Sequence, residues 1–325
     1  MLILSRTEVE SLLDLDRLVD ALAVAMVDLS RGRASAPPRV AAAVADRHAM
    51  VAAMPAYLPS SGALATKLVS VFPENADRPT HQAIICCFDP ASGAPVAVMD
   101  GTHVTAARTA AGSMLATRLL ARRGAGVVSV IGTGVQAQSH ARAAARLPGV
   151  QVVQIAGRHH PRAKALVDDL LETGIAATAL PSIEDAVRSA DVVCAATHAD
   201  EPVVRREWLR PGTHVNSVGY NIAGEGEVDV ATMRDALVVV ESRSAALTAP
   251  PAGAVELARA IEAGAVDADL VQEIGEIAAG DRAGRTDAGQ LTLYKSVGVA
   301  VQDAAAAGLI LEAAHARGVG TEIEV

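Results

Sequence analysis

Runs of apolar, often β-branched residues alternate with amphipathic stretches along most of this chain. Residues 5–31 show helical periodicity, and Ser5 and Glu8 form a capping-box pattern at their start. Strand-like runs separated by turns then follow at residues 40–44, 50–53, 64–71, 83–88 and 95–99. A helix followed by consecutive strands predicts an α+β domain.

From about residue 118 the pattern changes, because strand-like runs now alternate with helical ones. Strands are expected at residues 127–131, 151–155, 191–197, 212–219 and 236–241. Such alternation is typical of a parallel sheet in an α/β domain. Residues 291–307 have the pattern of one long helix that returns to the first domain. The chain therefore consists of an α+β part and an α/β part.

Composition excludes several classes of function. The chain has 325 residues, 51% of them hydrophobic, and a formal net charge of −9, which argues against a nucleic-acid partner. No apolar run has the length of a membrane span, and the first residues lack the pattern of a signal peptide, so we expect a cytoplasmic protein. Cys86, Cys87 and Cys194 form no disulfide or zinc pattern, and we expect no metal site.

A glycine-rich turn follows the apolar run at residues 127–131. Its sequence is G-x-G-x-x-A, from Gly132 to Ala137, and an Ala-rich helix comes directly after it. The first glycine permits the tight turn, and the second lets a pyrophosphate approach the backbone. The helix N-terminus then favours the phosphates. Strand, turn and helix stand in the order that this motif requires, so we predict a dinucleotide site.

The next strand ends in Gly157 and Arg158. A site for NAD usually has an acid at this strand end, which binds the ribose 2′-hydroxyl. Arg158 stands there instead, and its planar guanidinium suits a 2′-phosphate. The sequence therefore favours NADP(H) over NAD(H).

Basic residues also occur in apolar surroundings. Lys67 interrupts a run that otherwise suits a buried strand, Arg39 follows two prolines, and Arg108 falls early in a helix. A buried lysine is costly unless an anion pairs with it, whereas a lysine that extends its amine to water is not. From the residues alone, Lys67 and Arg108 are either surface residues or binding residues.

Several motifs together resemble the ornithine cyclodeaminase/μ-crystallin family. They stand at residues 38–39, 54–57, 67–73, 105–112, 131–136, 212–219 and 293–298, in the family's order and over nearly the whole chain. The resemblance implies an α/β fold in which a Rossmann dinucleotide-binding domain, residues 118–302, is inserted into an α+β dimerisation and substrate domain, residues 1–117 plus 303–325. It also implies a homodimer and a small-molecule amino-acid or imino-acid substrate.

The resemblance assigns roles to individual residues. It implies that Arg39, Lys67 and Arg108 bind the substrate carboxylate and that Lys67 also lies beside the reacting C–N centre. Three cations in a closed site would bind and orient such a carboxylate. The cofactor contacts expected from the motif and the resemblance together are Arg108, Thr109, Gly132, Thr133, Gly134, Val135, Gln136, Gly157, Arg158, Thr197, Val218, Gly219 and Ser296.

The chain departs from true cyclodeaminases in two places. Those enzymes have an Asp two residues after the glycine that matches Gly219, where this chain has Asn221, and an acid near Met54 that is absent here. A neutral amide cannot act as a base, so we assign Asn221 an orienting role in catalysis. The family's imine reductases lack that Asp and use NADPH.

We therefore predict an NAD(P)H-dependent oxidoreductase that acts on C–N bonds. Its substrate is a ketimine or cyclic imine of a 2-oxo acid, such as Δ1-pyrroline-2-carboxylate, which it reduces to the amino acid. The alternatives are an alanine-dehydrogenase-like amino-acid oxidoreductase, an ornithine cyclodeaminase and a non-catalytic NADPH-dependent ligand-binding protein.

Overall fold

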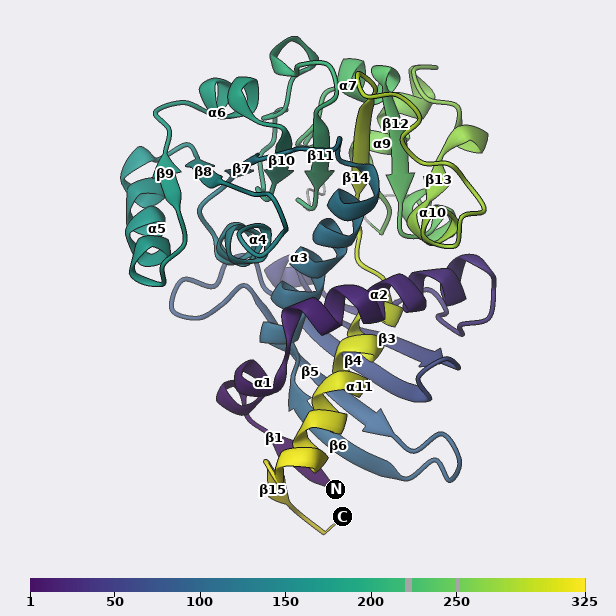
Figure 1. Ribbon diagram of the computed structural model, residues 1–325. Coiled ribbons are helices and arrows are strands. Elements are labelled where there is room, and N and C mark those ends of the chain that lie inside the picture. Colours follow the sequence, from purple (N-terminus) through teal and green to yellow (C-terminus); the bar gives the residue numbers. More distant parts are fainter. Residues whose placement is uncertain (220–223, 250–251, 325) are drawn as a thin grey trace. The chain divides into compact units, whose positions relative to one another are not determined.

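The computed structural model describes residues 1–219, 224–249 and 252–324 and divides into two compact units (Figure 1). Unit 1 consists of Met1–Arg108 and Gly298–Val325, and unit 2 of Thr109–Val297. The boundaries predicted after residues 117 and 302 differ from these. The reason is that helix α3 (Gly101–Leu120) is continuous across the first boundary, so no helix-ending signal marks Arg108.

Unit 1 is built on a mixed sheet in the order β15-β1-β6-β5-β4-β3-β2. Neighbouring strands from β2 to β6 are antiparallel. Its strands are β1 (Leu2–Leu4), β2 (Val40–Val44), β3 (Ala49–Leu58), β4 (Ala63–Val71), β5 (His81–Phe88), β6 (Pro95–Asp100) and β15 (Thr321–Glu322). Its complete helices are α1 (Arg6–Leu12), α2 (Leu15–Ser30) and α11 (Ala300–Arg317).

The helical pattern of residues 5–31 forms two helices and not one. The capping box of Ser5 and Glu8 is confirmed at the start of α1. Asp14 then caps α2 by accepting hydrogen bonds from the backbone of Asp16 and Arg17. A second cap inside an amphipathic stretch starts a new helix, because it satisfies backbone donors that a continuous helix would use itself.

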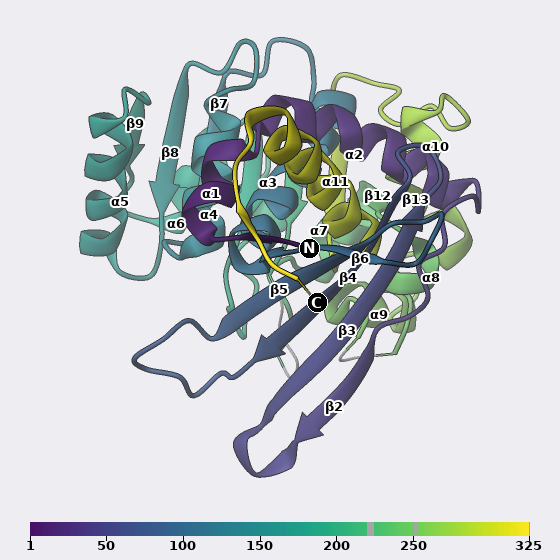
Figure 2. The same ribbon diagram turned by 90° about the horizontal axis from the view of Figure 1, so that it is seen from below.

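The two faces of the unit 1 sheet differ because side chains alternate along each strand. On one face Met54, Lys67, Ile85 and Met99 stand directly opposite one another in register, and all are buried. Figure 2 shows α2 and α11 on one side of this sheet. In the adjacent register row, on the other face, Val40, Leu68 and Ile84 are exposed.

Unit 2 contains a sheet in the order β13-β12-β14-β11-β10-β7-β8-β9, and the pairings between its described strands are parallel. Its strands are β7 (Val127–Ile131), β8 (Val152–Ala156), β9 (Ala177–Ala179), β10 (Val192–Ala195), β11 (His214–Ser217), β12 (Ala236–Val240), β13 (Gln272–Glu273) and β14 (Leu291–Lys295). Its helices are α4 (Val135–Ala144), α5 (His160–Glu172), α6 (Ile183–Ser189), α7 (Val230–Asp235), α8 (Arg243–Ala246), α9 (Val255–Glu262) and α10 (Ile274–Ala278).

The expectation of one helix over residues 291–307 is wrong in its first part. Residues Leu291–Lys295 form β14, which lies between β11 and β12, and the helix begins only at Ala300. All five residues of β14 are buried. A strand with both faces covered has no alternation of polar and apolar residues, so its periodicity does not separate it from a buried helix.

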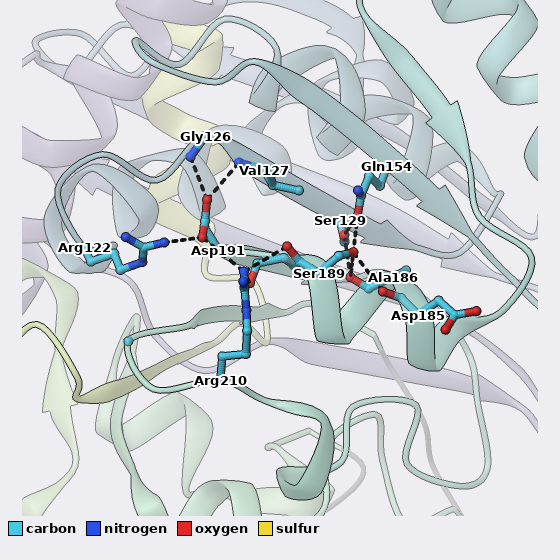
Figure 3. A network of polar contacts seen from close by, with 12 residues as sticks. Arg122, Gly126, Val127, Ser129, Gln154, Asp185, Ala186, Ser189, Asp191 and Arg210 are labelled. Atoms are coloured by element: carbon cyan, nitrogen blue, oxygen red, sulfur yellow. Dashed lines mark hydrogen bonds and ion pairs between the residues drawn. The ribbon is translucent and has the colours of Figure 1, made fainter.

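The amino ends of β7 and β10 are held together by one carboxylate (Figure 3). Asp191 accepts hydrogen bonds from the backbone N–H of Gly126 at 2.9 Å and of Val127 at 3.1 Å. Arg122 and Arg210 both pair with its other oxygen. This network therefore fixes the end of the sheet opposite to the glycine-rich turn.

None of the helices in the described part of the chain combines the length and apolar character that crossing a membrane requires.

We predict that unit 2 loses stability in mild acid, because two of its histidines are buried. Burial lowers the pKa of His140 to about 4 and that of His214 to about 3. Their folded pKa values lie below the unfolded value near 6.5, so the unfolded chain takes up protons that the folded chain does not. This stability is present above about pH 6.5 and is lost as the pH falls toward the folded values, by roughly 2 kcal/mol per histidine at pH 5.

The measurement is the free energy of urea unfolding between about pH 7 and 5. His140→Gln should flatten its pH dependence by nearly one proton. His315→Gln, the same change at an exposed position, is the control. An unchanged slope in His140→Gln would contradict this account.

Candidate functional site

Lys67 is a buried residue of β4, and its amine forms an ion pair inside unit 1. Its side chain is 2% exposed, and Nζ lies 2.7 Å from Oδ2 of Asp303 on α11. Its cross-strand neighbours in the buried row are Met54 and Ile85. The interpretation of Lys67 as an outward-facing lysine is therefore wrong. Asp303, near the other end of the chain, supplies the negative charge that stabilises its buried amine.

Arg108 shares the carboxylate that Lys67 contacts. Arg108 Nε donates to Asp303 Oδ1 at 3.1 Å, and Nη1 donates to Gln302 Oε1 at 2.9 Å. The same glutamine oxygen accepts the backbone N–H of Val299 at 3.2 Å. Arg108 is buried, so the interpretation of Arg108 as a surface residue is also wrong.

Arg39 joins this group through the backbone before α11. Its Nη2 donates to the carbonyl oxygen of Gly298 at 3.1 Å. Gly298 has a φ of +73°, and a Cβ built on it would lie 2.8 Å from Nη1 of Arg108. Only glycine both adopts this conformation easily and leaves room for the guanidinium. The three predicted basic residues are thus brought together in unit 1.

The surroundings of Lys67 bring its titration close to neutral pH. Its pKa is lowered from 10.5 to about 8, chiefly because burial disfavours the charged amine. Asp303 opposes this shift, whereas Arg108 and Arg39 add to it by repulsion. An amine with such a pKa can give up and regain a proton near neutral pH.

Asp303 and Gln302 were missed by the sequence analysis. They form a polar pair in the helical stretch 299–307, which is otherwise composed of Ala and Val. Buried polar residues need partners, so a Gln-Asp pair in such a stretch was an available signal. This signal does not identify the partners, because Lys67 and Arg108 lie far away along the chain.

The glycine-rich turn connects β7 to α4 as predicted. Gly132 has a φ of +125°, and a Cβ there would lie 2.6 Å from the carbonyl oxygen of Ala196. At Gly134, the N-cap of α4, a Cβ would meet nothing within 4 Å, and no side chain caps the helix. Open space at an uncapped helix N-terminus fits the pyrophosphate of a dinucleotide.

Gly157 and Arg158 follow β8 beside this turn. A Cβ on Gly157 would lie 3.1 Å from Cγ2 of Thr133. Arg158 is exposed. The structure therefore brings the residues expected to bind the phosphates and the ribose to one edge of the unit 2 sheet.

A buried glutamate that the sequence analysis missed holds the ends of β10 and β11. Oε1 of Glu227 accepts hydrogen bonds from the backbone N–H and the hydroxyl of Thr197. Its Oε2 accepts from the backbone N–H of Gly219 at 2.6 Å and from Ser217 Oγ at 3.1 Å. A Cβ on Gly219 would clash with this carboxylate and with the Thr197 carbonyl, so glycine is required there.

A second buried lysine completes this edge of the sheet. Lys295, at the end of β14, lies 2.8 Å from Glu256 Oε1, and its Nζ donates to the carbonyl oxygen of Gly219 at 2.9 Å. Gly219 is therefore bound at its N–H by one buried charge and at its carbonyl by another. Next to Lys295, the hydroxyl of Ser296 donates to Glu241 at 2.6 Å.

The remaining predicted residues have different outcomes. Thr109 is buried in α3, and Val218 follows β11, where its N–H donates to the Ala195 carbonyl. Val135 and Gln136 form the first turn of α4. Asn221 lies outside the residues that the structure describes. Within the described ranges, no group of three His, Cys, Asp or Glu side chains could hold a metal ion.

The sequence matches the model of the ornithine cyclodeaminase/mu-crystallin family over residues 1–318. The ketimine reductase mu-crystallin of Mus musculus is 35% identical over 300 residues, which cover 91% of this chain and 91% of that protein.

Solved structures agree in fold. The Δ1-pyrroline-2-carboxylate reductase of Thermococcus litoralis, in complex with NADH and L-proline, is 35% identical with a TM-score of 0.92, over 99% of this chain and 100% of that one. An archaeal alanine dehydrogenase dimer with bound NAD is 33% identical with a TM-score of 0.90, over 100% of this chain and 99% of that one. The predicted α/β class with a Rossmann domain is confirmed, and the chain belongs to the ornithine cyclodeaminase/mu-crystallin family.

Proposed function

We propose that this protein is an NAD(P)H-dependent reductase of a ketimine carboxylate, the cyclic or open imine of a 2-oxo acid. The observation that carries this proposal is the group of the buried Lys67 and Arg108 with the half-buried Arg39 in unit 1. Such a group suits a substrate that combines a carboxylate with a nitrogen that gains a proton. The open turn at Gly134 supports a dinucleotide as the hydride donor.

The chemistry requires one hydride and one proton. NAD(P)H, when bound, supplies the hydride that adds to the imine carbon. Arg39 and Arg108 bind the carboxylate and orient the C=N bond. Lys67, or a water beside it, supplies the proton that the nitrogen gains as the double bond becomes a single C–N bond. The product is the amino acid.

The relatives support this substrate class. The mouse relative is a ketimine reductase, and the Thermococcus litoralis enzyme was solved with NADH and L-proline. Proline is the product of reducing Δ1-pyrroline-2-carboxylate, a cyclic ketimine with an adjacent carboxylate. We propose that compound as the first substrate to assay.

A substrate panel separates the alternatives. Reduction of pyruvate with ammonia would favour the alanine-dehydrogenase type, and release of ammonia from ornithine with NAD would favour a cyclodeaminase. Asn221 stands where cyclodeaminases have an Asp, so we expect ornithine to be inert and Asn221→Asp to raise the affinity for cationic amino acids. Ligand binding without turnover of any substrate would indicate a binding protein.

Lys67→Met should abolish most of the activity. Loss of a group that pairs with the substrate and assists protonation should lower kcat/KM for the imine by about 10²–10⁴-fold. NADPH affinity, followed by fluorescence, should barely change, because the proposed phosphate site is the turn at Gly134. Lys164→Met, at an exposed lysine of α5, is the control. Turnover at the parent rate by Lys67→Met would refute the assignment of this site.

Cofactor choice follows from the residues after β8. We propose that Arg158 binds a 2′-phosphate, so kcat/KM for NADPH should exceed that for NADH by at least about tenfold, or roughly 1.4 kcal/mol. Arg158→Ala should shrink this ratio, whereas Arg234→Ala, at an exposed arginine of α7, should not. Equal use of both cofactors by the parent protein would remove the argument.

The open face of the unit 1 sheet supports a homodimer. Val40 and Ile84 are 73% and 45% exposed, and the row they share with Ala53 and Leu68 is apolar from β2 to β5 and ends at Asp100 on β6. An apolar sheet face of this kind closes readily on a two-fold copy. We therefore expect a dimer by light scattering at micromolar concentration.

Ile84→Arg should weaken this dimer, because a charge on that face would be buried without a partner. Leu171→Arg, at a similarly exposed apolar residue of α5, is the control. A monomeric parent protein, or an equally stable dimer in Ile84→Arg, would contradict this interface.

A further inference from the structure

One carboxylate pairs with two of the three cations in unit 1. Asp303 pairs with Lys67 through Oδ2 at 2.7 Å and with Arg108 through Oδ1 at 3.1 Å. The side chains of Lys67 and Asp303 are each 2% exposed, so water screens their interaction little. Asp303 is therefore in a position to act on both cations at once.

Only Lys67 in this group can change its charge near neutral pH. The guanidinium groups of Arg39 and Arg108 do not lose their protons in proteins. Both repel the Lys67 ammonium, and the residues directly opposite on β3 and β5 are the uncharged Met54 and Ile85. The anion that faces Lys67 comes from α11, so the charge on Lys67 depends on Asp303.

The start of α11 places Asp303 between Lys67 and Arg108. Asp303 lies in the first turn of this 18-residue helix, where the backbone dipole favours a negative charge. Gln302, its neighbour in that turn, fixes the second branch of Arg108.

We propose that Asp303 is a positioning residue that keeps Lys67 protonated for imine reduction while it aims Arg108, and that it thereby sets the alkaline limit of the reaction. This inference rests on the proposed function, because it concerns the proton that Lys67 supplies. Beyond that function, we predict that Asp303, which donates no proton to the substrate, decides the pH range of turnover.

The direction of the effect follows from the charges. The attraction of Asp303 raises the pKa of Lys67 against the lowering effects of burial, Arg108 and Arg39. Removing that negative charge must lower the pKa further, so Lys67 would lose its proton at a lower pH. Activity that needs the ammonium is present below this pKa and lost above it. The alkaline limit should therefore move to lower pH.

The experiment measures kcat and kcat/KM for Δ1-pyrroline-2-carboxylate with NADPH between about pH 5.5 and 9.5. Asp303→Asn keeps the shape of the side chain and removes its charge. We expect its alkaline limit to lie at least about one pH unit below that of the parent. Any titration of the substrate itself is the same for both proteins, so the difference between the profiles isolates the enzyme group.

Three further variants make the result specific. Lys67→Arg cannot lose its charge, so its residual activity should lack the limit that Lys67 sets and keep only a limit due to titration of the substrate. Asp303→Glu restores the charge and should return the limit toward that of the parent. Asp28→Asn removes another buried carboxylate of unit 1, which pairs with Arg33, and should leave the limit unchanged. Thermal unfolding of each variant shows whether it is folded.

The outcomes separate this inference from the proposed function. An alkaline limit that moves down in Asp303→Asn, persists in Asp28→Asn and moves up or disappears in Lys67→Arg supports the inference. Unchanged limits in folded Asp303→Asn, with only a raised KM, would overturn it and leave the reductase assignment intact. Should Asp303→Asn not fold, an alkaline limit in Lys67→Arg at the same pH as in the parent would overturn it instead. If Lys67→Met turns over the imine at the rate of the parent, the proposed function itself fails.

Discussion

Two buried cations and a half-buried third can lie within one small region only if an anion is buried with them. In unit 1 that anion is Asp303, which joins Lys67 of β4 to Arg108 of α3. The remaining arginine, Arg39, is bound by the backbone at Gly298, two residues before α11 begins. This group of three cations therefore forms only when α11 has packed on the sheet formed by the first part of the chain.

In unit 2, buried carboxylates accept hydrogen bonds from backbone N–H groups at the ends of the strands. Asp191, just before β10, satisfies two backbone donors at the amino end of β7, while Glu227 satisfies donors at the carboxyl ends of β10 and β11. Buried carboxylates that accept several hydrogen bonds fix a backbone more strongly than neutral partners do. The sheet is thus rigid at both ends, and the strand ends nearest the glycine-rich turn keep a defined shape.

Much of the architecture could be predicted because it depends on local patterns. The turn from Gly132 to Ala137 and the strands β2 and β7 follow from short apolar runs and glycine positions. The strand β14 could not, because burial on both faces removed the alternation that identifies a strand. The boundary at Arg108 was missed for a different reason, since α3 has no interruption there.

For the candidate site, the sequence by itself singled out Lys67 in an apolar strand and the glycines of a turn between a strand and a helix. It could not determine what neutralises Lys67, because Asp303 lies more than two hundred residues away along the chain. The sequence also did not indicate the role of Glu227, because nothing in it shows that Thr197 and Gly219 bind the same carboxylate. Charge pairs of this kind depend on distances in space, and only tertiary structure decides those distances.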